Sequence, residues 1–226
     1  MLISNHPSGC AIDARTVASE RSRAEKEVRT MKRFLCLAIL GVIVLSSCGT
    51  PADERSDESG SAAREAEVEQ VLEPYGLNGK TPREVIGTLD RLPLDERPTE
   101  LMASVRPDEL ILTVGDTEAR MKLADDSFYL SAAPFITQTH ECFFHSLTTC
   151  VGELSEAEVH VKIVDDSTGD VLVDKDVKTF DNGFVGFWLP SSIEGTMTIR
   201  SGDKTGSVEF NTGADAPTCL TTLRLA

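Results

Sequence analysis

Three cysteines and two histidines in the second half of the chain are spaced in a way that could bind a soft metal ion. His140, Cys142, His145 and Cys150 lie in one short segment, and Cys219 follows near the C-terminus. Thiolates favour Cu(I), Zn(II) and iron–sulfur clusters. Three thiolates suit Cu(I), whereas tetrahedral zinc needs a fourth ligand, for which His140 or His145 is available. The sequence therefore indicates a site for a soft metal ion. Copper is one interpretation, with zinc as a possible substitute, and a zinc-binding module is the alternative.

The same cysteines leave a second interpretation open. Cys142 and Cys150 are eight positions apart, which is too far for a Cys-x2-Cys zinc knuckle but suits two sides of a loop whose ends meet. Structural disulfides use cysteines in pairs, so three cysteines in an exported domain leave one over. In this alternative Cys142 and Cys150 form a disulfide, Cys219 is buried and inert, and the chain is a structural or interaction lipoprotein of the cell envelope.

The N-terminal segment predicts export. Met31 is followed by two basic residues and by an unbroken apolar run over residues 34–45. This run is shorter than the ~20 residues that span a bilayer, and it matches the core of a signal peptide. Leu45-Ser46-Ser47-Cys48 resembles a bacterial lipobox, which implies lipidation at Cys48. We therefore expect residues 1–47 to be a leader whose true start is Met31, and the exported protein to be anchored to the membrane through Cys48.

The charge balance excludes another class of function. The chain carries 22 basic and 37 acidic residues, a net charge of −15. A general nucleic-acid binder needs a basic surface, and an aromatic content of 5% is too low for a base-stacking platform. Loss of residues 1–47, which carry seven basic and four acidic residues, takes the net charge to −18. Residues 48–65 are small and charged, which is typical of a flexible tether.

Residues 66–130 have the pattern of a small α+β subdomain. Apolar residues recur at helical spacing from Val68 to Tyr75, although Pro74 disfavours the second half of that helix. Thr81-Pro82-Arg83-Glu84 has the pattern of a capping box, which predicts a helix that runs to about Arg91. Strands are expected at residues 110–114, 118–123 and 128–132, with a turn at Gly115-Asp116.

Residues 131–226 have the pattern of a β-rich domain. Short apolar stretches alternate with turn signals such as Thr168-Gly169-Asp170 and Asn182-Gly183. Such spacing is typical of a sandwich or barrel. The predicted fold class is therefore α+β, with a helical and strand N-terminal subdomain followed by a sandwich-like C-terminal domain that carries the metal site.

Several motifs together resemble the CueP family of copper-binding envelope proteins. The central match is FITQTHECFFHSLTTC over residues 135–150, followed by Gly152-Glu153-Leu154. The remaining matches are Leu92-Pro93, Glu96-Arg97-Pro98, LMASVRP at residues 101–107, Gly183-Phe184, FWLP at residues 187–190 and PTCLTT at residues 217–222. The resemblance extends over essentially all of residues 66–226.

The resemblance implies a periplasmic or cell-surface protein with a role in copper resistance. It places the copper ligands on Cys142, Cys150 and Cys219. Proteins of this family are described as reducing Cu(II) to Cu(I) and as supplying copper to a superoxide dismutase. Cys142 and Cys150 are the expected electron donors if the loop brings them together. Because turnover would need an external reductant, we expect a copper-binding protein with redox activity rather than an enzyme.

Overall fold

The N-terminal helix begins inside the segment that the sequence predicts to be a tether. The computed structural model describes the backbone of residues 54–226 and the side chains from residue 60 onward; the leader, Met31 and Cys48 lie outside these residues. Helix α2 runs over Glu54–Leu72, so a flexible tether is wrong from Glu54 onward. Alanine, glutamate and arginine, which are good helix formers, are frequent in its sequence ERSDESGSAAREAEVEQVL.

Proline and capping residues set the next helices as expected. Helix α2 gives way to the 3-10 helix η1 (Glu73–Tyr75), which contains Pro74. Helix α3 (Pro82–Leu89) begins at the predicted capping box, in which the Thr81 N–H donates to Glu84 Oε2 at 2.8 Å. It ends slightly before the predicted Arg91. A second 3-10 helix, η2 (Leu94–Glu96), follows.

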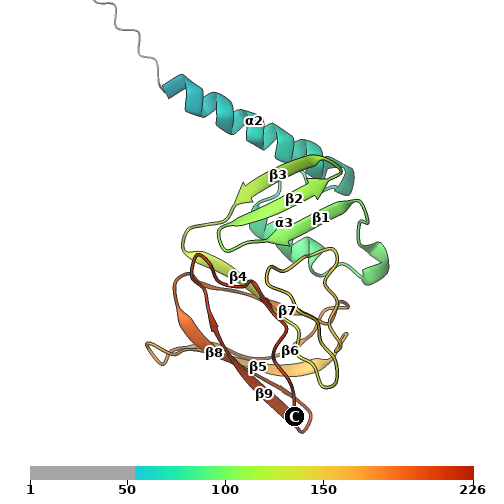
Figure 1. Cartoon of the computed structure of the whole chain (residues 1–226), viewed down its shortest axis with the longest axis vertical. Helices are drawn as coiled ribbons and strands as arrows, with labels where there is room; N and C mark the ends of the chain where they lie inside the picture. Colours follow the sequence, from blue (N-terminus) through green and yellow to red (C-terminus); the bar gives the residue numbers. More distant parts are fainter. Residues whose placement is uncertain (1–53) are drawn as a thin grey trace, which may run out of the picture. The chain divides into compact units, whose positions relative to one another are not determined.

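An antiparallel sheet packs against these helices. It contains β1 (Leu101–Val105), β2 (Glu109–Val114) and β3 (Thr117–Lys122) in that order. The sequence reasoning missed β1. One apolar core joins the helices to the sheet, and its fully buried members include Leu72, Val85, Ile86, Leu101, Leu110 and Leu112. Figure 1 shows α2 and α3 beside this sheet.

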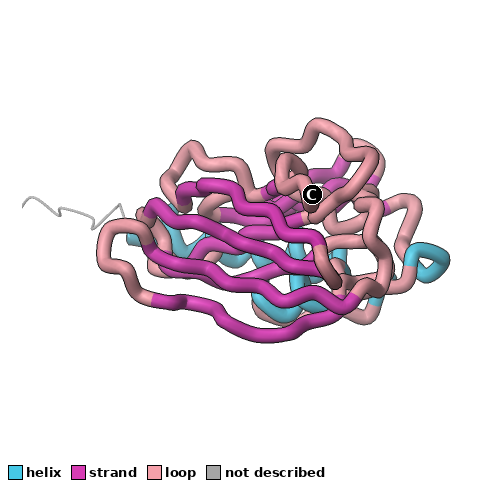
Figure 2. Tube along the Cα trace, turned by 90° about the horizontal axis from the view of Figure 1, so that it is seen from below, coloured by secondary structure: helices cyan, strands magenta, loops and turns pink. Residues whose placement is uncertain are grey.

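Two further sheets form the predicted sandwich. The first contains β4 (Ser127–Ala132), β7 (Val185–Pro190) and β10 (Cys219–Leu220), in the order β10-β4-β7. The second has the order β6-β5-β8-β9, with β5 (Glu158–Asp165), β6 (Val171–Lys178), β8 (Glu194–Ser201) and β9 (Lys204–Asn211). Their long strands lie side by side in Figure 2. The α+β class with a sandwich is confirmed.

Strand β4 links the two cores. It pairs with β7 and β10 of the sandwich, so the sandwich starts at Ser127 and not after the expected boundary at residue 130. Phe128, Leu130 and Ala132 enter the sandwich core, whereas Tyr129 packs into the core of α2, α3 and the first sheet. Successive side chains of a strand point to opposite faces, so one strand supports both cores.

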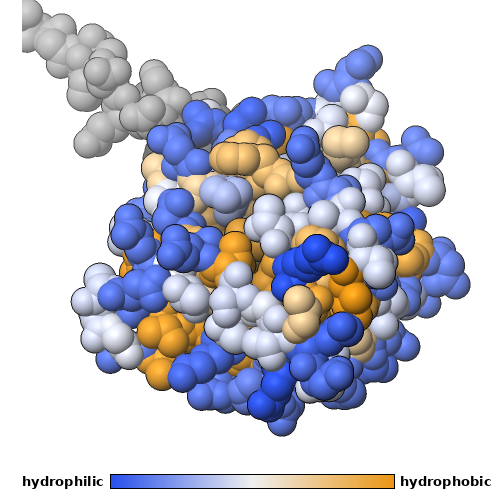
Figure 3. Space-filling view, turned by 60° about the horizontal axis from the view of Figure 1, so that its bottom comes forward, coloured by the Kyte–Doolittle hydropathy of each residue, from blue (hydrophilic) through white to orange (hydrophobic). Residues whose placement is uncertain are grey.

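The surface of the folded part is mostly hydrophilic. Figure 3 shows one face on which polar and charged residues predominate and apolar residues occur in small patches. Among the helices of residues 54–226, none combines the length and the hydrophobicity needed to cross a membrane.

We predict that Gly186→Ala destabilises the fold. A Cβ at position 186 would lie 1.8 Å from the Tyr129 hydroxyl oxygen, and this oxygen is fixed by a 2.5 Å hydrogen bond to Asp90. Overpacking of this kind typically costs about 1–3 kcal/mol of unfolding free energy, which urea denaturation would measure. Gly60→Ala, in the middle of α2, is the control, because it improves helix propensity without a clash. Equal stability of the two variants would contradict the prediction.

Candidate metal centre

Main-chain hydrogen bonds fix the cysteine-containing loop between the two cores. The Val105 N–H of β1 donates to the His145 carbonyl oxygen at 2.8 Å, and the Leu147 N–H donates to the Ala103 carbonyl oxygen at 2.8 Å. The loop therefore extends the edge of the first sheet. On its other side, the Cys219 N–H of β10 donates to the carbonyl oxygen of Phe143 at 3.2 Å.

Thr218 connects the same three segments through its side chain. Its buried hydroxyl donates to the Val105 carbonyl oxygen at 2.7 Å and accepts the N–H of His145 at 3.0 Å. Thr218 therefore sets the spacing between β1, the loop and Cys219. The sequence reasoning assigned no role to this residue.

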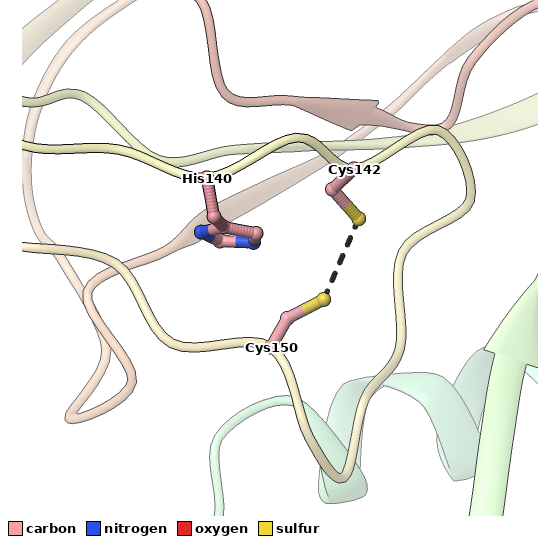
Figure 4. A group of neighbouring side chains, drawn as sticks. All are labelled: His140, Cys142 and Cys150. Atoms are coloured by element: carbon pink, nitrogen blue, oxygen red, sulfur yellow. Dashed lines mark hydrogen bonds between the residues drawn. The ribbon is translucent and has the colours of Figure 1, made fainter.

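The loop brings Cys142 and Cys150 together. Their sulfur atoms are 3.5 Å apart, and Figure 4 shows the two side chains pointing toward one another. This distance is too long for a disulfide bond, which requires about 2.05 Å, and Cys142, Cys150 and Cys219 are all free thiols in the structure. The structure therefore describes the arrangement of the three thiols with no bond between Cys142 and Cys150.

All five expected ligands belong to two overlapping groups. His140, Cys142 and Cys150 form one group, and His145, Cys150 and Cys219 form the other; within each group the ligand atoms lie within 4.8 Å of one another. Cys150 is common to both groups, and neither group contains all three cysteines. The structure therefore brings the expected residues together, but as two sets of one nitrogen and two sulfurs.

The two groups differ in burial. Cys219 and His145 have exposed fractions of 3% and 0%, and Cys150 has 8%. Cys142 is only partly buried, and His140 lines a cavity of about 230 Å³ that also contacts Val151. We call the His140 group the outer group and the His145 group the inner group.

A fully buried carboxylate holds the inner histidine. Asp90 Oδ1 lies 2.9 Å from His145 Nε2, and the Tyr129 hydroxyl donates to Asp90 Oδ2 at 2.5 Å. The Asn182 side-chain amide donates to both the Asp90 carboxylate and its carbonyl oxygen, each at 3.0 Å. Because Nε2 is engaged, Nδ1 of His145 is the nitrogen that faces Cys219, at 3.8 Å. Outer partners of this kind fix the orientation of a metal-ligating histidine.

The buried pair shifts the pKa of each partner. Burial by itself would raise the pKa of Asp90, but the charge of His145 and the hydrogen bonds from His145, Tyr129 and Asn182 outweigh it and lower the pKa. Burial would likewise lower the pKa of His145, but the Asp90 carboxylate raises it to about 9. A charged pair is therefore favoured in the metal-free protein.

The neighbours of Cys150 shift its pKa in the opposite direction from those of the other two thiols. Hydrogen bonds from Cys142 and Cys219 lower the pKa of Cys150, and His145 acts in the same direction. The hydrogen bond to Cys150 raises the pKa of Cys142 to about 11, and hydrogen bonds to both other thiols raise the pKa of Cys219. Since a thiolate is the metal-ligating form of cysteine, Cys150 is the thiol best prepared to bind a metal.

Comparison with known proteins identifies the family. The profile described as "Periplasmic copper-binding protein CueP" matches residues 84–224, which include both groups and Asp90. The chain belongs to the CueP family. A solved structure described as "Crystal Structure of S.CueP" is similar, with 39% identity, a TM-score of 0.66, and coverage of 70% of this chain and 96% of that chain. No curated protein matches the chain.

The CueP membership and the geometry agree with the resemblance inferred from the sequence motifs. Sequence reasoning missed the residues that orient the ligands, namely Asp90, Tyr129, Asn182 and Thr218. Asp90 lies at the end of α3, and Asn182 lies in a segment whose sequence indicates only a turn. Their role depends on contacts between positions far apart in the chain, so no local signal marks them.

We predict that Asp90→Asn strongly destabilises this CueP-family domain. The change leaves His145 without its buried counter-charge, and breaking a buried pair from one side typically costs about 3 kcal/mol or more. Urea denaturation would measure the loss of unfolding free energy. Asp95→Asn, at an exposed position of η2, is the matched control and should leave the stability unchanged. A loss no larger than that of the control would refute the role of Asp90.

We further predict a pH-dependent effect of Glu153→Gln. The Glu153 carboxylate accepts hydrogen bonds from the Thr137 hydroxyl and from the N–H groups of residues 136–138, the segment that leads to His140. The Thr137 bonds are the main cause that lowers the pKa of Glu153 from 4.5 to about 2. The carboxylate therefore contributes fully above pH 4.5, and this contribution is lost as the pH falls towards 2.

The difference in unfolding free energy between the parent protein and Glu153→Gln should accordingly be largest near pH 6 and should shrink towards pH 3. Denaturant titrations at a series of pH values would measure it. Glu141→Gln, at an exposed position in the same loop, is the control, with no such trend expected. A difference that stays constant from pH 6 to pH 3 would contradict the assignment.

Proposed function

We propose that this protein binds Cu(I) through Cys142, Cys150 and Cys219, assisted by His140 and His145. The observation that carries the proposal is the convergence of these five side chains around Cys150 in a chain of the periplasmic copper-binding family. Soft thiolate ligands select Cu(I), and the burial of Cys150 and Cys219 protects the bound ion from water and oxidants.

The ligand number favours Cu(I) over zinc. Each group offers one nitrogen and two sulfurs, and Cu(I) accepts a coordination number of three. Structural zinc sites have four ligands, so zinc would need a water molecule or a rearranged loop. Zinc is accordingly a weaker substitute for copper at this centre.

The same centre supports reduction of Cu(II). Cys142 and Cys150 can each give one electron, so that two Cu(II) become two Cu(I), one disulfide forms, and any thiol proton passes to solvent. Cys219 and a histidine then remain to hold a Cu(I) product. The sulfur atoms, 3.5 Å apart, need to approach by about 1.5 Å. An external thiol reductant must reduce the disulfide before a second cycle, so the protein is a copper binder with redox activity.

The cellular setting follows from the leader and from the family. We propose an exported lipoprotein that is anchored to the membrane through Cys48 and acts in copper resistance. A copper-dependent client, such as a superoxide dismutase, would receive the metal. Anchoring at Cys48 would restrict the protein to clients that reach the membrane surface.

We predict that Cys150→Ser causes the largest loss of Cu(I) affinity among the single cysteine variants. Cys150 belongs to both groups, so its loss leaves neither complete. Competition against a colorimetric Cu(I) chelator, with the full chain fully reduced, should show at least about 100-fold weaker binding. Loss of a residue that only hydrogen-bonds to a ligand costs up to about 100-fold in metal affinity, and loss of a ligand should cost at least as much.

Met102→Leu is the control for exposed sulfur, because the side chain of Met102 is 55% exposed on β1 and belongs to neither group. It should bind Cu(I) as tightly as the parent protein. Unchanged affinity in Cys150→Ser, with the fold intact by circular dichroism, would refute the proposed centre.

A further inference from the structure

We propose that Cu(I) occupies two successive positions that share Cys150: an entry position on His140, Cys142 and Cys150, and a holding position on His145, Cys150 and Cys219. This inference rests on the proposed copper binding and concerns how the same centre loads its ion. The structure has two complete three-ligand groups, each with one histidine nitrogen and two sulfurs.

The geometry of the ligand atoms carries the proposal. In each group the three ligand atoms lie within 4.8 Å of one another, which is close enough for one ion to contact all three. The two groups have no histidine in common, and Cys142 belongs to one group while Cys219 belongs to the other. An ion that moves between the groups can therefore remain bound to Cys150 while its other two ligands are exchanged.

Burial gives the exchange a direction. The outer group contains a partly buried thiol and the histidine that lines the cavity. The inner group contains a histidine with no exposed surface and a cysteine that is 3% exposed. Phe143 and Val151, each about half exposed, flank the outer group in the chain. An incoming ion meets the outer ligands first and reaches the inner ligands afterwards.

The supporting contacts of the two histidines also differ. Asp90 holds His145 through Nε2 and leaves Nδ1 directed at Cys219, so the inner ligands are preorganised. His140 has no such carboxylate partner among the hydrogen bonds of residues 60–226. Both rings lie beside Phe184, with centroid distances of 6.2 Å for His140 and 4.6 Å for His145. The inner position is therefore the rigid one, and the outer position adapts more easily to an incoming ion.

The exchange balances without a redox change. Cu(I) keeps its bond to the Cys150 thiolate, loses its bonds to His140 and Cys142, and gains bonds to His145 and Cys219. The Cys219 thiol gives up a proton as it binds, and the departing Cys142 thiolate takes one up. His145, which is charged beside Asp90 before the ion arrives, gives its Nδ1 proton to solvent as it binds, and His140 leaves as a neutral ring. The exchange thus releases one net proton, and copper stays Cu(I) throughout.

X-ray absorption on the fully reduced chain with one equivalent of Cu(I) tests the proposal. We expect about two sulfur and one nitrogen neighbours for the parent protein. Cys142→Ser should take up Cu(I) at least tenfold more slowly from a chelator in stopped-flow measurements, and should lose less of the final affinity than Cys219→Ser. His140→Ala should show the same slow uptake.

Cys219→Ser removes the holding position, and we expect rapid uptake with at least tenfold weaker final binding. Because Cys219 is buried, thermal unfolding must show that this variant folds; the surface variants Cys142→Ser and His140→Ala test the proposal in any case. Three sulfur neighbours without nitrogen, or equal uptake rates in the parent and both surface variants, would overturn the two positions while leaving copper binding intact. Failure of the parent to bind Cu(I) would instead refute the proposed function.

Discussion

The fully buried carboxylate of Asp90 is the contact on which the metal centre depends. It comes from the end of α3, and it binds His145 of the loop, Tyr129 of β4 and Asn182 of the turn before β7. These residues come from four parts of the chain, and two of them belong to the sandwich side. A buried charge tolerates few arrangements of its partners, so the Asp90 network fixes how the helical part, the loop and the sandwich meet.

The loop itself has little regular structure and is held by its neighbours. It is joined to β1 by backbone hydrogen bonds and to β10 by the Thr218 hydroxyl and the Cys219 N–H. The carbonyl oxygen of Cys150 accepts a hydrogen bond from the Arg97 guanidinium at 2.8 Å. Ligands on a loop are held in a precise geometry only when rigid elements surround the loop. Here the sheet that contains β1 and the sheet that contains β10 supply that support.

The candidate metal ligands of this acidic protein are sulfur and nitrogen atoms and not carboxylates. The net charge of −15 describes a solvated surface, whereas the two metal groups contain only cysteine and histidine. Cys150 is central to both because two thiols, the His145 ring and the Ser146 N–H all surround its sulfur atom. The neighbours that stabilise a thiolate at Cys150 also place its sulfur atom within reach of both groups.

Local motifs such as FITQTHECFFHSLTTC were enough to predict the family and to suggest candidate ligands, and the alternation of apolar residues was enough to predict the fold class. The sequence also predicted α3, whose capping box is a local interaction. It missed β1, placed the boundary at residue 130 inside the β4 region, and took the start of α2 for a tether. The folded chain was needed to see that the five candidate ligands form two groups around Cys150, and that Asp90 and Asn182 lie beside them. These residues lie far apart in the chain, and their spacing along the sequence does not tell how far apart they lie in the folded protein.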